Sequence, residues 1–102
     1  MDVHTKCGAV GDVNPADAEV QEVVQKVKAA FEAKSGVNTA EFKAVTFATQ
    51  VVAGTNYFVK VSLGGGHFCH LRIYQPLPYT KQGPRLDGYE LDKTEQDTIS
   101  YF

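Results

Sequence analysis

The chain has 102 residues, 43% of them hydrophobic, and a formal net charge of −2 at pH 7. This length is enough for one domain with one core, and the mildly acidic, evenly mixed charge argues against a nucleic-acid partner. No apolar run approaches the roughly 18 residues that a membrane span needs, and the first residues lack the apolar segment of a signal peptide. We therefore expect a cytoplasmic protein that binds neither nucleic acid nor membranes.

The two cysteines, Cys7 and Cys69, lie far apart in the sequence. A secreted domain of this size usually carries several disulfides. The low count therefore indicates two free thiols in a reducing compartment, with one long-range disulfide as the alternative.

One amphipathic helix is predicted from residue 14 or 15 to residue 34, after an extended, glycine-rich arm over residues 1–13. Asn14 is the expected N-cap, with Pro15 at the first helical position. Apolar residues then recur at helical spacing and form one stripe. The stripe consists of Val20, Val23, Val24, Val27 and Phe31. Gly36 is suited to the left-handed conformation that ends a helix.

Four β-like runs follow, at residues 42–49, 57–63, 68–74 and 88–92. In the second and third runs apolar and polar residues alternate, which predicts strands with one face turned to a core. The inward residues are Tyr57, Val59, Val61, Leu63, Cys69, Leu71 and Ile73. Three glycines at 64–66 predict a tight hairpin connection, and Pro76 ends the third run. The pattern predicts an α+β fold in which an antiparallel sheet packs on the helix.

Candidate catalytic or metal-binding residues are few. Cys69 and His70 are adjacent, so they point to opposite faces of a strand and cannot act as a nucleophile–base pair. His67 shares a face with Cys69, but only His4 or Cys7 could complete a set of metal ligands. We interpret Cys69 as a core residue and the histidines as solvated or hydrogen-bonded, and we expect no enzymatic activity, no metal and no other cofactor. A small metal- or thiol-dependent enzyme using Cys69, His67 and His70 is the alternative.

Two short apolar segments fall where loops are normally polar. Residues 51–53 (VVA) lie between the first two strands. Either the two valines extend a strand and the turn lies at residues 54–56, or the tip is exposed because a partner binds it. Residues 77–79 (LPY) follow the third strand and, by strand counting, lie at the same edge of the sheet. Since the N-terminal arm can reach this edge too, the three elements together predict a wedge.

Several segments resemble one known family. Residues 50–54 (QVVAG) match the Q-x-V-x-G loop of the cystatins, and the longer run 50–58 (QVVAGTNYF) resembles the stefin branch, the type 1 cystatins. Residues 7–9 (CGA) are similar to the glycine-bearing trunk, residues 77–78 (LP) to the second hairpin, and residues 101–102 (YF) to the common ending of the family. These motifs occur in register along nearly the whole chain.

The resemblance implies one stefin-type cystatin domain over residues 1–102, with residues 1–13 as its arm. In that fold one long helix packs against a curved antiparallel sheet of four to five strands. We expect a monomer. Because a β-branched pair is poor turn chemistry, straightening residues 50–54 would merge residues 42–49 and 55–63 into one strand, which gives a domain-swapped dimer as a further state.

The resemblance further implies a tight, reversible inhibitor of papain-like cysteine proteases, including cathepsins of the B, H, L and S types. The arm and two hairpin loops would block the active-site cleft sterically. The residues implied to contact the protease are Cys7, Gly8, Ala9, Gln50, Val51, Val52, Ala53, Gly54, Leu77, Pro78 and Tyr79. The alternative is a cystatin-fold module that no longer inhibits and serves in interaction or self-assembly.

Overall fold

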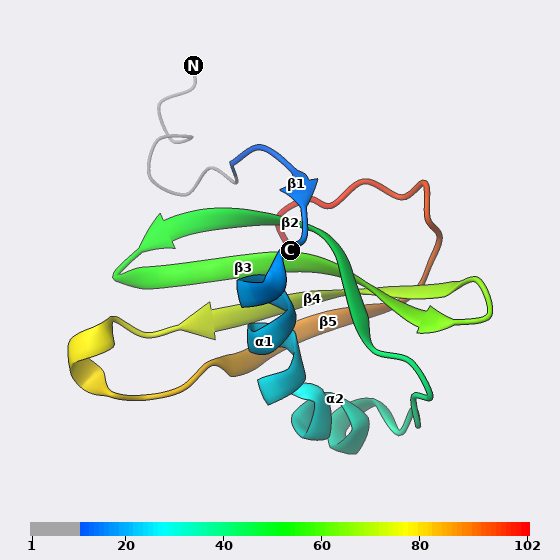
Figure 1. Cartoon of the computed structure of the whole chain (residues 1–102), viewed down its shortest axis with the longest axis horizontal. Helices are drawn as coiled ribbons and strands as arrows, with labels where there is room; N and C mark the ends of the chain where they lie inside the picture. Colours follow the sequence, from blue (N-terminus) through cyan, green and yellow to red (C-terminus); the bar gives the residue numbers. More distant parts are fainter. Residues whose placement is uncertain (1–10) are drawn as a thin grey trace.

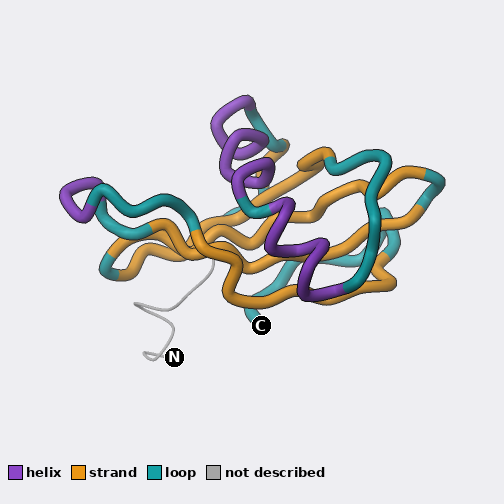
Figure 2. Tube along the Cα trace, turned by 90° about the horizontal axis from the view of Figure 1, so that it is seen from below, coloured by secondary structure: helices purple, strands orange, loops and turns teal. Residues whose placement is uncertain are grey.

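A five-stranded antiparallel sheet forms the body of the protein, with strand order β1-β2-β3-β4-β5. The structure is a computed structural model that describes residues 11–102, so Cys7, Gly8 and Ala9 lie outside the described residues. Two α-helices run across one side of the sheet (Figure 1, Figure 2). The predicted α+β class is confirmed.

The predicted single helix is divided into α1 (Ala18–Lys26) and α2 (Lys28–Ser35), which meet at Val27. The backbone of Val27 leaves helical geometry at φ −105° and ψ 5°. Its side chain is nevertheless buried, because the apolar stripe continues through the break. Gly36 ends α2 in the left-handed region at φ 75°, as predicted.

The predicted helix start at Asn14 and Pro15 is wrong. These two residues form the short strand β1 (Asn14–Pro15), which pairs antiparallel with Phe47 and Thr46. A residue before proline favours extended backbone, which suits a strand better than a helix. The N-cap is Asp17, whose Oδ1 accepts a hydrogen bond from the Val20 N–H at 2.9 Å.

The remaining strands follow in sequence order. They are β2 (Lys43–Val52), β3 (Gly54–Gly64), β4 (His67–Gln75) and β5 (Arg85–Lys93), each antiparallel to the one before. All four predicted runs are confirmed, and each strand is longer than its predicted run, β3 and β5 most of all. The β3–β4 turn uses positive φ at all three glycines predicted to form it, and β4 stops before Pro76.

The core lies between the helices and the near face of the sheet. The predicted helical stripe packs there against the inward residues of β3 and β4. Val59, Val61, Cys69, Leu71 and Ile73 are fully buried, as the alternation predicted. The complete burial of Cys69 confirms its interpretation as a core residue. This burial raises the pKa of the free thiol to about 12, which keeps it protonated.

The far face of the sheet is also covered, which the sequence pattern did not predict. The segment 94–102 lies over it, and the rings of Tyr101 and Phe102 pack on Phe58 with centroids 5.7 and 5.9 Å apart. Lys60 is buried and donates to the carbonyl of Glu95. The strands of the sheet centre are therefore buried on both faces rather than on one.

His70 lies on this covered face, so of its two predicted environments, solvated or hydrogen-bonded, the solvated one is wrong. The side chain is 2% exposed, and its Nε2 has no hydrogen-bond partner among residues 11–102. It is therefore neither solvated nor hydrogen-bonded at that atom.

Within residues 11–102, neither helix has the length and apolar character needed to cross a bilayer.

Candidate functional site

The β2–β3 hairpin ends in a tip of one residue, Ala53. Val52 pairs with Gly54, and Val51 with Thr55, so the two valines extend β2 and the turn lies at Ala53 rather than at residues 54–56. Yet Val51 is 75% exposed and Val52 42% exposed. Each of the two interpretations of this segment is therefore partly correct, because the valines are in a strand and their apolar side chains face solvent.

Gly54 holds this tip against the end of β4. Its φ of +117° is one that L side chains rarely adopt, and a Cβ at this position would lie 2.6 Å from the carbonyl oxygen of Gln75. The same Cβ would lie 3.0 Å from the ring and hydroxyl of Tyr74. Both conformation and space therefore require glycine here.

Gln50 is a buried residue at the base of the hairpin and is not part of its exposed tip. The side chain is 5% exposed, and its Oε1 accepts a hydrogen bond from Asn56 Nδ2 at 2.8 Å. Gln50 and Asn56 are also register partners of β2 and β3. This cross-strand bond fixes the base of the tip.

The second apolar segment follows β4 and lies beside the first tip, at the left of Figure 1. Pro76 is buried and Leu77 half-buried, and the short 3-10 helix η2 (Pro78–Thr80) then exposes Tyr79 to 80%. The Thr80 hydroxyl donates to the Leu77 carbonyl at 2.8 Å. Local hydrogen bonding therefore shapes this loop.

A hollow of about 320 Å³ lies between helix α1, the start of β3 and the second apolar segment. Its wall includes Val23 of α1, Gly54 and Tyr57 of β3, and Leu77. Burial raises the pKa of the Tyr57 hydroxyl, and the nearby Glu19 carboxylate adds to the rise. Tyr57 thus stays neutral in a hollow whose wall also includes the charged residues Glu19, Glu22 and Lys26 of α1.

The start of the described chain reaches the same edge of the sheet. The Gly11 N–H donates to the Thr49 carbonyl at 2.8 Å, one residue before Gln50. The structure thus brings residues 51–53 and 77–79 together, and places residue 11 alongside β2. The predicted trunk residues, Cys7, Gly8 and Ala9, lie outside the described residues.

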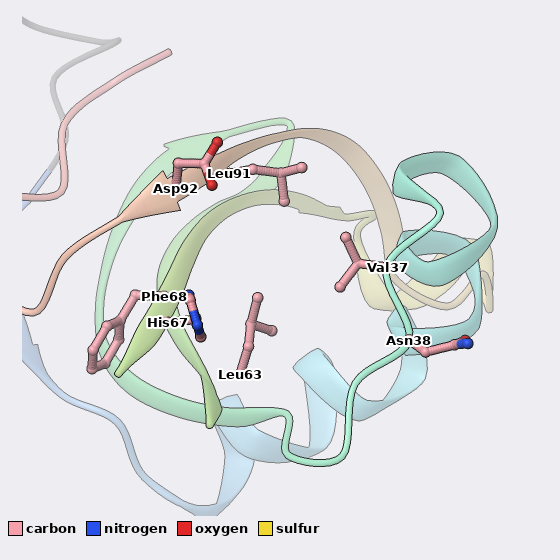
Figure 3. Close-up of a pocket in the computed structure, with 7 residues that line it drawn as sticks. All are labelled: Val37, Asn38, Leu63, His67, Phe68, Leu91 and Asp92. Carbon is pink, nitrogen blue, oxygen red and sulfur yellow. The ribbon is translucent and has the colours of Figure 1, made fainter. Parts of the chain in front are cut away.

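The residues of the alternative metal or thiol site are not brought together. His67 lines a different hollow of about 260 Å³, at the opposite ends of β3, β4 and β5 (Figure 3). Cys69 is in the core, and His70 is on the far face of the sheet. In the part of the chain that the structure describes, no three His, Cys, Asp or Glu side chains cluster so as to hold a metal ion.

The comparison with known families agrees with this arrangement. The family model "Cystatin domain" matches residues 8–96. The chain belongs to the cystatin family. Cystatin-B of Mus musculus is 45% identical over 96 residues, which cover 94% of this chain and 98% of the mouse protein.

Two further relatives extend the similarity. Cystatin-B of Homo sapiens is 43% identical over 96 residues, covering 94% of this chain and 98% of the human protein. Leukocyte cysteine proteinase inhibitor 1 of Sus scrofa is 40% identical over 95 residues, covering 93% of this chain and 92% of the pig protein. The resemblance to the stefin branch of the cystatins is thereby confirmed.

Proposed function

We propose that this cystatin is a tight, reversible inhibitor of papain-like cysteine proteases. One observation carries the proposal: the tip with the exposed Val51 and Val52 lies against the end of β4, where residues 76–80 (the Leu77 loop) begin. Solvent-exposed apolar side chains on paired, hydrogen-bonded hairpins are suited to a concave partner. The family and the printed name of the pig relative support a protease as that partner.

The proposed mechanism is steric. Val51, Val52 and Ala53 enter the active-site cleft, and Leu77, Pro78 and Tyr79 cover its primed side. The trunk Cys7-Gly8-Ala9 lies along the non-primed subsites, where Gly8 lets the backbone pass the catalytic cysteine without presenting a bond for cleavage. Gln50 and Gly54 hold the first tip in shape.

Affinity in this mechanism comes from apolar burial and not from covalent chemistry. A standard interface covers about 800 Å² per partner. Rigid hairpins lose little conformational entropy on binding, so most of the gain from burial is retained. The protein is thus an inhibitor and not an enzyme.

The finer assignments belong to the same proposal. We propose that the targets are cathepsins of the B, H, L and S types and that the active form is a cytoplasmic monomer. A panel of inhibition constants against these four proteases, with size-exclusion chromatography of the inhibitor, tests both the targets and the monomer.

The deciding experiment is inhibition of papain by the wild type and by Val51→Asp. A charge at this exposed tip would have to be desolvated in the cleft, so we expect the inhibition constant to rise at least about tenfold. The matched control is Ala29→Asp, which adds the same charge at an exposed position of α2. If the wild type does not inhibit papain, the alternative of a non-inhibitory cystatin-fold module is correct.

A further inference from the structure

Four polar or aromatic side chains form one row across the sheet beside the first hairpin tip. Gln50 pairs with Asn56, Asn56 with Tyr74, and Tyr74 with Arg85. The row therefore crosses β2, β3, β4 and β5 on one face, since paired residues of neighbouring strands point to the same side. Asn56, Tyr74 and Arg85 were not among the residues that the sequence singled out.

Tyr74 connects this row to the tip itself. Its hydroxyl donates a hydrogen bond to the carbonyl of Ala53, the single residue at the turn. A Cβ added at Gly54 would lie only 3.0 Å from the Tyr74 ring. The missing side chain at Gly54 is thus what lets the Tyr74 hydroxyl reach the turn.

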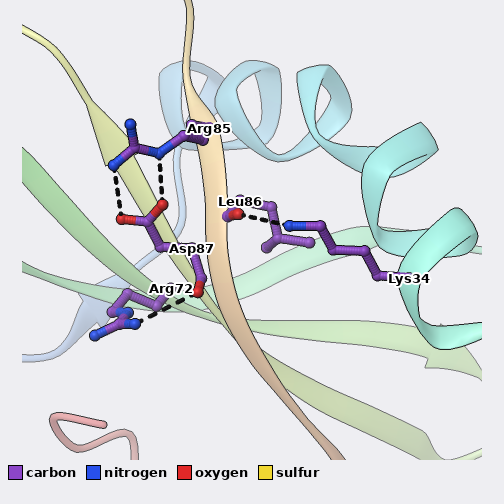
Figure 4. Close-up of polar contacts among 5 residues, drawn as sticks. All are labelled: Lys34, Arg72, Arg85, Leu86 and Asp87. Carbon is purple, nitrogen blue, oxygen red and sulfur yellow. Dashed lines mark hydrogen bonds and ion pairs between the residues drawn. The ribbon is translucent and has the colours of Figure 1, made fainter.

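Arg85 contacts the ring of Tyr74. Its guanidinium carbon lies 5.1 Å from the ring centroid, within the range of a cation–π contact. Two hydrogen bonds at 2.6 and 3.3 Å tie the same guanidinium to the carboxylate of Asp87 (Figure 4). Hydrogen bonding to Arg85 lowers the pKa of the Asp87 carboxyl, which keeps the pair charged near neutral pH.

We infer that Tyr74 is a positioning residue for inhibition: braced by Arg85, its hydroxyl fixes the β2–β3 tip beside the Leu77 loop. The inference rests on the proposed function for its link to inhibition. The position of the tip, however, is a property of the free protein and is measurable without a protease.

Loss of the hydroxyl loosens the tip without removing a side chain that enters the cleft. If only part of the population then holds the tip in place, apparent affinity falls by that fraction. Loss of one hydrogen bond of ordinary net strength changes the ratio of held to loosened tip by about three- to tenfold. Since the bound complex is unchanged, the association rate falls and the dissociation rate stays the same.

The test compares Tyr74→Phe with Tyr89→Phe. The Tyr89 hydroxyl also donates to a backbone carbonyl, that of Lys34 at 3.1 Å, but it connects β5 to the end of α2 and not to the tip. Amide hydrogen exchange over residues 51–55 is measured first, on the free variants. We expect about three- to tenfold faster exchange there in Tyr74→Phe and wild-type exchange in Tyr89→Phe.

Stopped-flow association and dissociation with papain form the second measurement. Tyr74→Phe is expected to associate more slowly, by at most the roughly three- to tenfold seen in exchange, with an unchanged dissociation rate. Arg85→Gln is expected to slow association by less than Tyr74→Phe does. Unchanged exchange at the tip overturns the inference. So does faster dissociation at an unchanged association rate, because Tyr74 would then contact the protease directly. If the wild type does not inhibit papain, the proposed function fails while the exchange measurement still decides the role of Tyr74.

Discussion

Single residues set the shape of the proposed binding edge, the end of the sheet with residues 51–53 and 77–79. Gly54 does so through two separate constraints. Its positive φ excludes most side chains, and the Gln75 carbonyl occupies the space a Cβ would need. Gly66, in the β3–β4 turn, has φ +81° but open space around it. A side chain at Gly66 would therefore cost stability only through backbone strain, whereas a side chain at Gly54 would add a steric clash.

We predict that Gly66→Ala lowers the free energy of unfolding by about 1 kcal/mol, through backbone strain alone. Gly54→Ala is expected to lower it by about 3 kcal/mol or more, because a clash with backbone is added to the strain. Urea denaturation of both variants measures the difference. Equal losses would show that the approach of Gly54 to Gln75 is not tight in solution.

A second residue-scale prediction concerns pH and His70. Burial lowers the pKa of this histidine, and the charges of Lys93 and then Lys60 lower it further, against the opposing effect of Glu90 and Asp97. The unfolded chain therefore binds the proton more tightly than the folded one does. Stability from neutral His70 is complete above about pH 6.5 and is lost as the pH falls below that value.

The measurement is the urea midpoint at pH 7.5 and at pH 5. We expect the wild type to lose stability between these values and His70→Gln to lose less, since glutamine does not titrate. His67→Gln, which leaves the buried histidine in place, is the control and should behave as the wild type. A wild-type loss equal to that of His70→Gln would contradict the prediction.

At the scale of elements, the side-chain patterns predicted the buried faces correctly. They were less successful in predicting where the elements begin. The valine stripe and the alternation in β3 and β4 identified core residues, because those patterns depend on each element's own period. The start of the helix depends instead on pairing between Asn14 and Phe47, which are far apart in sequence. A local cap motif could not reveal that pairing.

The cap assignment itself is testable. Asp17→Ala is expected to lower the free energy of unfolding by about 1 kcal/mol, because it removes the acceptor for the Val20 N–H. Asn14→Ala should cost less than half as much, since Asn14 does not cap the helix. Thermal or urea unfolding of the two variants measures this, and the reverse order would restore Asn14 as the N-cap.

The same limit applies to the candidate site. The apolar tips were visible in the sequence because apolar loops are unusual. Tyr74 was not, since a tyrosine in an alternating strand carries no sign of its partner. Only the register of β3 against β4 brings its hydroxyl to Ala53.

At the scale of the whole molecule, the one-residue turn at Ala53 favours a domain swap between two copies of the chain. Straightening it would join β2 and β3 into one long strand, and the helices and β2 of one copy would pack on the sheet of another. We predict that mild heating yields a slowly reverting dimer that does not inhibit papain, because the tip no longer exists in it.

Size-exclusion chromatography followed by a papain assay on each peak tests this prediction. Replacing Val51 and Val52 with Asn and Gly, which favour a turn, should suppress the dimer and weaken inhibition together. A dimer that inhibits as strongly per chain as the monomer would contradict the prediction that the swap removes the inhibitory tip.

Residue 102 and the β3–β4 turn differ in how well they tolerate added chain, and this matters for engineering. Phe102 packs on Phe58, so a tag fused after it would compete with a contact that closes the far face. The β3–β4 turn lies at the opposite end from the binding edge, and nothing comes within 4 Å of a Cβ at Gly66. A fluorophore or a grafted peptide is therefore best inserted at Gly66, where it can report on or redirect the inhibitor while both hairpin loops stay free.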